Sequence, residues 1–124
     1  MSGPASHTSD NADKWEVQLR KGCLELAILA VLAEEKLYGL EILKRLESGS
    51  ELIVSEGTIY PLLSRLKTLG LIRSEWVESH GGHPRKYYSL TAAGRRRALE
   101  MAESWHKFAS SMGKLLLSLA TTRR

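Results

Sequence analysis

Side chains that can bind phosphate groups and base edges recur between residues 55 and 94 of the chain. They combine hydroxyl groups with fixed positive charges, and one phenol precedes them: Tyr38, Ser55, Thr58, Tyr60, Ser64, Arg65, Lys67, Arg85 and Lys86. Hydroxyl groups and the cations of Arg and Lys are the groups that proteins most often present to a nucleic-acid backbone. The pattern predicts a surface that contacts a polyanion, with double-stranded DNA as the expected partner.

The positive charge of the chain is concentrated in the same region. The chain has 124 residues and a formal net charge of +4. Between residues 58 and 97, eight cations stand against two anions, which leaves +6 there and −2 on the remainder. Such clustering is typical of one surface that faces a polyanion. A basic face that is only solvated is the alternative interpretation of the charge alone.

The helix that would carry most of the hydroxyl groups is expected from Ser55 to Leu69. Its apolar residues recur at helical spacing and form one stripe: Ile59, Leu62, Leu63, Leu66 and Leu69. At about 100° per residue, a second set points away from that stripe: Gly57, Tyr60, Pro61, Ser64 and Thr68. The Ser55 side chain is a suitable N-cap and Gly70 a suitable C-terminal cap. The helix would bury one face and present a slim, polar face to a groove.

A two-stranded hairpin is expected after this helix, and two helices before it. Residues 72–78 contain β-branched and aromatic residues, residues 85–90 contain Tyr87 and Tyr88, and a turn cluster with Gly81 and Gly82 separates the two segments. The first helix should begin near Val17 to Leu19 and end around residues 34–36, because its apolar residues fall at helical spacing. A second helix should open at Tyr38-Gly39 and end near residues 48–50.

A long last helix is expected from a cap at Thr91 to about Thr121. Seven residues are spaced alternately by three and four and form a heptad seam: Ala98, Met101, Trp105, Phe108, Met112, Leu115 and Leu119. A helix of this length extends about 45 Å, more than the small domain that it leaves. Pairing with a second copy would bury the seam. Folding back on the first three helices is the other interpretation, and the two are compatible.

The sequence predicts a mainly α fold with a two-stranded β-wing. In this interpretation residues 1–13 form a disordered tail, 14–91 a winged helix-turn-helix DNA-binding domain, and 92–122 a C-terminal dimerisation helix. Cys23 is the single cysteine, so neither an intrachain disulfide nor a zinc cluster is expected. No cofactor, catalytic constellation or membrane-spanning segment is predicted, and the expected location is the cytoplasm.

Two motifs resemble the PadR-like family of transcriptional regulators. They read GTIYPLLSRLKTLGLIRSEW from Gly57 and GGHPRKYYSLTAAG from Gly81, and the Tyr38-Gly39 pair also fits. The resemblance covers residues 19–94, and an ESW triplet ending at Trp105 resembles small members with one C-terminal helix. His83 departs from the pattern, because an Arg is frequent at that position. A neutral His there would give one fixed phosphate contact fewer.

The resemblance implies a homodimeric regulator, usually a repressor, that binds an inverted repeat. Half-site centres would lie about 34–36 Å apart. It also implies release of the DNA by a small aromatic or cationic, apolar effector. In small members the residue matching Trp105 lines a cavity at the dimer interface, and Trp15, Phe108 and Met112 would extend it; simple packing of Trp105 is the alternative. A winged-helix module that binds another protein remains the second functional hypothesis.

Overall fold

The structure, a computed structural model, describes residues 3–49, 52, 54–78 and 81–122. Its elements follow one another in the order α1 (Gly3–Glu34), β1 (Leu37–Tyr38), α2 (Gly39–Gly49), α3 (Glu56–Thr68), β2 (Ile72–Val77), β3 (Arg85–Leu90) and α4 (Ala92–Thr122). No helix in these described ranges is long and apolar enough to cross a bilayer. The order confirms the predicted winged-helix architecture with a long last helix.

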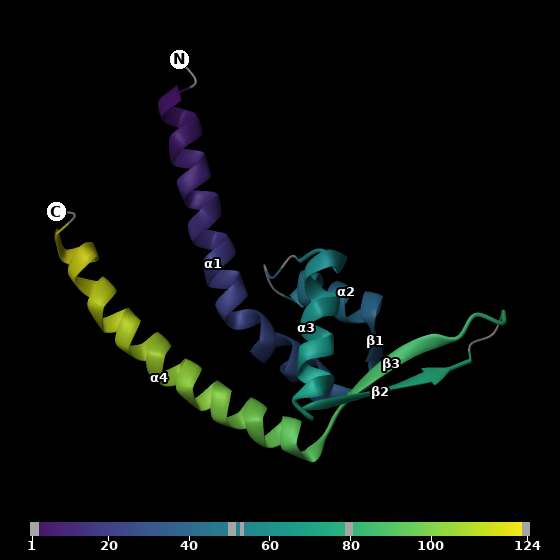
Figure 1. Ribbon diagram of the computed structural model, residues 1–124. Helices are drawn as coiled ribbons and strands as arrows, with labels where there is room; N and C mark the ends of the chain where they lie inside the picture. Colours follow the sequence, from purple (N-terminus) through teal and green to yellow (C-terminus); the bar gives the residue numbers. More distant parts are fainter. Residues whose placement is uncertain (1–2, 50–51, 53, 79–80, 123–124) are drawn as a thin grey trace.

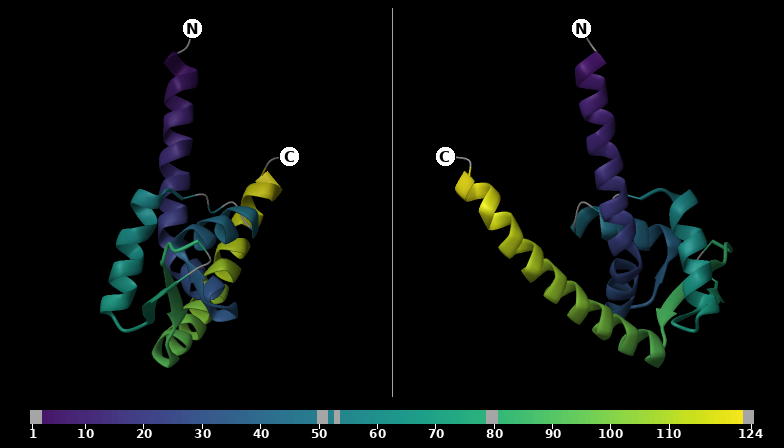
Figure 2. Two further views of the ribbon diagram at one scale, coloured as in Figure 1. Left: turned by 90° about the vertical axis from the view of Figure 1, so that its right-hand side faces the viewer. Right: turned by 60° about the vertical axis from the view of Figure 1, so that its left-hand side comes forward.

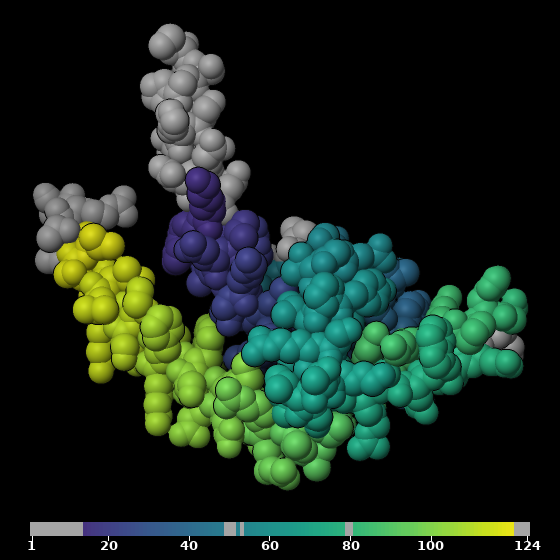
Figure 3. All heavy atoms as spheres, in the orientation of Figure 1, coloured from purple at the N-terminus to yellow at the C-terminus, as the bar shows by residue number. Residues whose placement is uncertain are grey.

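α1, α2, α3 and a small sheet form the body of the molecule. The N-terminal part of α1 and most of α4 extend beyond this body. α1 and α4 approach each other near the start of α4 and diverge toward their free ends (Figures 1 and 2). α3 and the hairpin of β2 and β3, which we call the wing, lie on the opposite side of the body. The space-filling view shows the wing as an arm that stands out from the helices (Figure 3). The wing and the free ends of the long helices are therefore separate surfaces.

The core lies where α1, α2, α3 and the sheet meet. The buried side chains come from every element except α4: Leu24, Ile28, Leu29, Leu32, Leu37, Ile42, Leu46, Ile59, Leu63, Leu66, Ile72 and Tyr88. Ala98 and Met101, at the start of the heptad seam, pack against this cluster. Most of the α4 surface beyond Met101 is exposed. The body thus covers only the beginning of the seam.

α3 ends in a Schellman motif, as the position of Gly70 predicts. Gly70 has a φ of 78°, a left-handed conformation that costs glycine little. Its N–H donates to the carbonyl of Lys67 at 2.9 Å, and the N–H of Leu71 donates to that of Leu66 at 3.0 Å. At the other end the Ser55 hydroxyl does not cap the helix, contrary to expectation. It lies 3.3 Å from the Thr58 hydroxyl, and that pairing replaces the predicted cap.

The sheet has three antiparallel strands in the order β1-β3-β2, so the prediction of two strands was incomplete. β2 and β3 pair from Ile72 opposite Leu90 to Val77 opposite Arg85. β1 adds Tyr38 opposite Tyr87 on the other edge of β3. A strand of two residues has no periodicity that a sequence could reveal, and only its pairing with β3 makes it extended.

α1 begins at Gly3, well before the predicted start at Val17 to Leu19. Residues 3–13, which were predicted as a disordered tail, therefore lie in this helix, while residues 1 and 2 are outside the described ranges. Residues 3–13 have no apolar stripe that would predict a helix from the sequence. Extending an existing helix adds one hydrogen bond for each residue that it fixes, so no new nucleus is needed.

The junction between α3 and α4 is tied by Thr91, which caps α4 as predicted. Its hydroxyl accepts from the N–H of Gly94 at 2.9 Å. The same hydroxyl lies 2.7 Å from the carbonyl oxygen of Gly70 and 3.0 Å from that of Leu71. A Cβ built at Gly94 would overlap the Leu71 carbonyl oxygen. The first turn of α4 can therefore approach the end of α3 only with glycine at this position.

Gly94→Ala is expected to lower the free energy of unfolding by about 1–3 kcal/mol, because the added methyl forces the junction apart. Urea denaturation followed by circular dichroism measures the change. Gly113→Ala, in the same helix, is the matched control, since a Cβ there meets nothing within 4 Å. That variant should gain about 1 kcal/mol from helix propensity. Equal stabilisation by both substitutions would contradict the packing argument.

Candidate nucleic-acid interface

One exposed face of α3 carries only small, uncharged side chains. Gly57, Pro61, Ser64 and Thr68, which we call the outward face, are all exposed. Ile59, Leu63 and Leu66 on the opposite side are buried in the core. Because the helix is held by its apolar side, the outward face is free to contact a partner along its length. The predicted site residue Ser64 lies on this face.

The side of α3 that faces α1 carries hydroxyl groups beside cations. Ser55 and Thr58 line a cavity of about 180 Å³ together with Arg20 and Lys21 of α1. The predicted site residues included only the first two. Arg20 and Lys21 precede the basic region of the sequence, so only the packing of α1 against α3 reveals their position. A phosphate group at this cavity would be bound by hydroxyl and cationic groups together.

Arg65 is engaged within the molecule. Its Nη1 donates to Glu25 Oε2 of α1 at 2.8 Å, although the Arg65 side chain remains largely exposed. The guanidinium was predicted to bind phosphate or to solvate the helix, and in the structure it forms an ion pair that links α3 to α1. Lys67, the other predicted cation of α3, is exposed in the last turn of the helix. Other exposed cations lie on the wing.

The cations of the wing are combined with aromatic rings. The Arg85 guanidinium carbon lies 4.5 Å from the centroid of the Tyr38 ring, and that ring meets Tyr87 edge to face at 5.5 Å. Lys86 Nζ lies 5.9 Å from the Trp76 ring centroid. These distances fit cation–π contacts, which hold a cation in position without neutralising its charge. Trp76 and Tyr87 were not predicted as site residues.

Predicted residues from three elements meet in one groove of about 440 Å³, which we call the wing groove. Its lining comes from β1, the start of α2, α3 and the two strands of the wing: Tyr38, Gly39, Leu40, Tyr60, Trp76, Arg85, Lys86 and Tyr88. A Cβ at Gly39 would overlap the Tyr60 ring, so that ring packs directly on the backbone of α2. The groove thus contains four of the predicted DNA-binding residues.

Two phenols of the wing groove, Tyr60 and Tyr88, remain protonated at neutral pH. Burial, and then the Glu56 carboxylate, raise the pKa of Tyr60 above its ordinary value of 10.0. Burial, followed by the proximity of Tyr60, likewise raises the pKa of Tyr88. A protonated phenol can donate a hydrogen bond, whereas a phenolate would repel a phosphate. Both hydroxyl groups are therefore in the form that an anionic partner requires.

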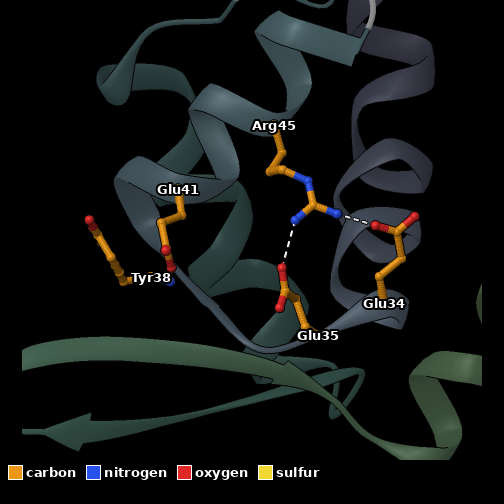
Figure 4. Close-up of polar contacts among 5 residues, drawn as sticks. All are labelled: Glu34, Glu35, Tyr38, Glu41 and Arg45. Carbon is orange, nitrogen blue, oxygen red and sulfur yellow. Dashed lines mark hydrogen bonds and ion pairs between the residues drawn. The ribbon is translucent and has the colours of Figure 1, made fainter.

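Tyr38 is positioned by contacts on both sides of the turn between α1 and α2. Its backbone N–H donates to Glu41 Oε1 at 3.1 Å. Arg45 of α2 contacts two carboxylates, with Nη1 donating to Glu35 Oε1 just after α1 at 2.7 Å and Nη2 contacting Glu34 Oε1 at the end of α1 (Figure 4). Such a fork joins the two helices with defined geometry. The turn that presents the Tyr38 ring to Arg85 is thereby anchored to both.

A separate apolar cavity of about 690 Å³ lies on the other side of the molecule, where α1 and α4 diverge. We call it the interhelical cavity; its lining is Trp15, Glu16, Leu19, Arg20, Cys23, Leu26, Ala27, Leu52 and Trp105. Two of the four residues predicted for an effector, Trp15 and Trp105, thus share one cavity. Phe108 lines a neighbouring cavity of about 290 Å³ that also contacts Trp105, and Met112 lines neither.

Three helices followed by a β-hairpin wing, with the third helix exposed on one face, form the architecture of winged-helix DNA-binding proteins. Residues 28–100 match the sequence model of the family described as the transcriptional regulator PadR-like family. The chain therefore belongs to this family of DNA-binding transcriptional regulators, and it is not an enzyme.

Solved structures and a curated relative agree with this assignment. A PadR family regulator from Eggerthella lenta is 34% identical, with a TM-score of 0.81 over 90% of this chain and 96% of that one. A PadR-like transcription factor from Bacteroides fragilis is 42% identical, with a TM-score of 0.68 over 82% of this chain and 98% of that one. A transcriptional regulator from Mycobacterium tuberculosis is 36% identical over 67% of this chain and 81% of its own length.

Proposed function

We propose that the protein is a homodimeric repressor that binds an inverted-repeat operator. In this proposal the outward face of α3 enters the major groove, while the wing groove and the cavity at Ser55 and Thr58 bind flanking phosphates. The observation that carries it is the wing groove, because it gathers Tyr38, Tyr60, Arg85 and Lys86 from three elements beside the exposed helix face. Cations combined with donor hydroxyls fit a phosphate backbone better than a neutral protein surface.

Dimerisation is supported by the exposure of the heptad seam. Trp105 is 45% exposed, Phe108 64% and Leu115 68%, although their spacing is that of residues buried between paired helices. Exposed apolar side chains gathered on one helix face mark an interaction surface. A second copy that packs its own α4 against this seam would bury them. The same pairing would place two copies of α3 and the wing on one duplex.

A gel-shift titration with the full chain and the DNA upstream of its own gene tests operator binding. Specific binding should exceed binding to random duplex of the same length by at least about a thousandfold. The affinity should also fall steeply with salt, because phosphates neutralised by the protein release their counterions. If no upstream fragment binds more tightly than random DNA, the winged-helix protein-interaction module becomes the better interpretation.

We further propose that the interhelical cavity admits a flat, apolar effector that releases the DNA. Trp15 and Trp105 offer two indole rings to such a ligand within one cavity. Trp105→Ala is expected to weaken the binding of proflavine, a planar aromatic cation, about tenfold, because aromatic stacking contributes up to about 1.5 kcal/mol. Fluorescence titration with proflavine measures the binding. Both proteins carry Trp76→Phe, which removes the fluorescence of the tryptophan in the wing. The effector site is contradicted if Trp105→Ala remains dimeric and binds proflavine as tightly as its parent.

A further inference from the structure

Pro61 lies inside α3, where proline weakens a helix. It lacks the N–H that would donate to the carbonyl of Gly57, and its ring crowds the preceding turn. Proline is common at the first helical position, but α3 begins at Glu56, so Pro61 is in the second turn. Its side chain is exposed and belongs to no part of the core. The packing of the protein therefore does not explain its presence.

Gly57, one turn earlier on the same exposed face, is also unexplained by packing. Gly57 is the second residue of α3, and glycine favours the helical conformation less than alanine does. A Cβ at Gly57 would have only the Ser55 hydroxyl within 4 Å, at an ordinary contact distance of 3.7 Å. The contrast with Gly39 and Gly94 is clear, since a Cβ at either of those positions would overlap a neighbouring group. Inside this chain, alanine would fit at Gly57.

Two residues that weaken α3 without serving its packing are thus placed at positions i and i+4 of the outward face. Residues that lower helix propensity without improving the packing of the protein are typical of functional positions. The remaining outward residues, Ser64 and Thr68, carry short hydroxyl side chains. None of the four has the guanidinium or ammonium group that reads guanine, or the amide that reads adenine. The most prominent group on this face is the apolar ring of Pro61.

We propose that the Pro61 ring contacts the 5-methyl group of a thymine in the major groove, and that Gly57 leaves room for the duplex to come within reach. Of the groups on the major-groove edges of the bases, only the thymine methyl is apolar. An apolar ring therefore distinguishes thymine from cytosine by contact, without a hydrogen bond. The inference rests on the proposed function, because it assigns a base to the outward face of a DNA-binding α3.

Removal of that methyl group alone tests the contact. Duplexes enriched by the full-length protein from a random library supply the probe, and each thymine is replaced in turn by deoxyuridine. Replacement at the contacted thymine of one half-site should weaken binding about fourfold, and in both half-sites about fifteenfold, from the transfer free energy of one methyl group. Other thymines should show less than a twofold change.

Two variants test whether Pro61 and Gly57 cause the loss of affinity that follows deoxyuridine substitution. Pro61→Ala restores a helix N–H, so its thermal unfolding midpoint should be unchanged or higher, while its deoxyuridine penalty should fall below twofold. Gly57→Ala should also remain folded, but it should bind thymine and deoxyuridine duplexes equally weakly, because the added methyl holds the helix away from the groove. Ser64→Ala, on the same face, is the control and should keep the full penalty.

The possible failures are distinguishable. If duplexes are enriched but no deoxyuridine substitution costs more than twofold, or if Pro61→Ala keeps the wild-type penalty, the thymine contact is overturned. Wild-type affinity in Gly57→Ala overturns the role given to that glycine. If the library yields no enriched duplex at all, the proposed DNA-binding function itself fails, and the contact fails with it.

Discussion

Replacing Arg85 and Lys86 together by alanine should lower operator affinity about a thousandfold at 0.15 M salt. A dimer would lose four phosphate contacts, and each contributes about 0.9 to the slope of log affinity against log salt concentration. The slope should therefore become shallower by about 3.6, and the affinities of variant and parent should converge near 1 M salt. Filter binding over a series of salt concentrations measures both quantities.

The matched control removes two positive charges from each subunit outside the wing. Lys107 and Lys114 are exposed on α4, outside the heptad seam and far along the chain from the wing. Their double alanine variant changes the net charge equally, and it should alter the affinity by less than about tenfold. Equal losses in the two double variants would mean that net charge, and not the wing groove, determines binding. A wing variant with an unchanged salt slope would contradict phosphate contact by Arg85 and Lys86.

Phe108→Glu combined with Leu115→Glu is expected to convert the dimer into a monomer. Two carboxylates per helix would have to be buried against a partner, and unpaired charges are not tolerated there. Light scattering should show the mass falling from twice 13.8 kDa to 13.8 kDa. Operator affinity should fall by about 10²–10⁴, because the second half-site is no longer bound by a tethered subunit.

Lys107→Glu combined with Lys114→Glu introduces acidic side chains on the same helix outside the seam. That variant should remain dimeric. Circular dichroism should show both double variants to be folded, since the two seam residues are exposed and contribute nothing to the core. If the Phe108 and Leu115 variant keeps the mass of its parent, α4 does not pair through this seam, and the two half-sites must be joined in another way.

The elements that the sequence predicted well are those with a strong local signal. α3 was placed within one residue at each end, because its apolar stripe is continuous and Gly70 provides its C-terminal cap. The bounds of β3 and the cap at Thr91 were also predicted, since two tyrosines and a preceding Gly-Gly turn mark the strand and a hydroxyl marks the cap. These signals lie within a few residues of the feature that they determine.

The features that were missed depend on contacts between distant parts of the chain. Arg65 has the same exposure pattern as any cation of a surface helix, and only the approach of α1 shows that Glu25 binds it. Lys21 lies outside the basic region and joins Ser55 and Thr58 only through packing. In the wing groove, the sequence predicted Arg85 and Lys86 but not Trp76, because an exposed aromatic residue on a strand has the same local pattern as a buried one.

The joint at Thr91 makes α4 a lever. The helix has 31 residues and is therefore about 46 Å long, and its near end is pinned to the end of α3 by the Thr91 hydroxyl. A rotation of about 5° at this joint would displace the far end by about 4 Å, from that length. That displacement exceeds the rise of one base pair, about 3.4 Å. In a dimer joined through two α4 helices, rotation at Thr91 would change the distance between the two copies of α3. The stiffness of this junction would then determine whether the protein can bind half-sites whose spacing differs by one base pair.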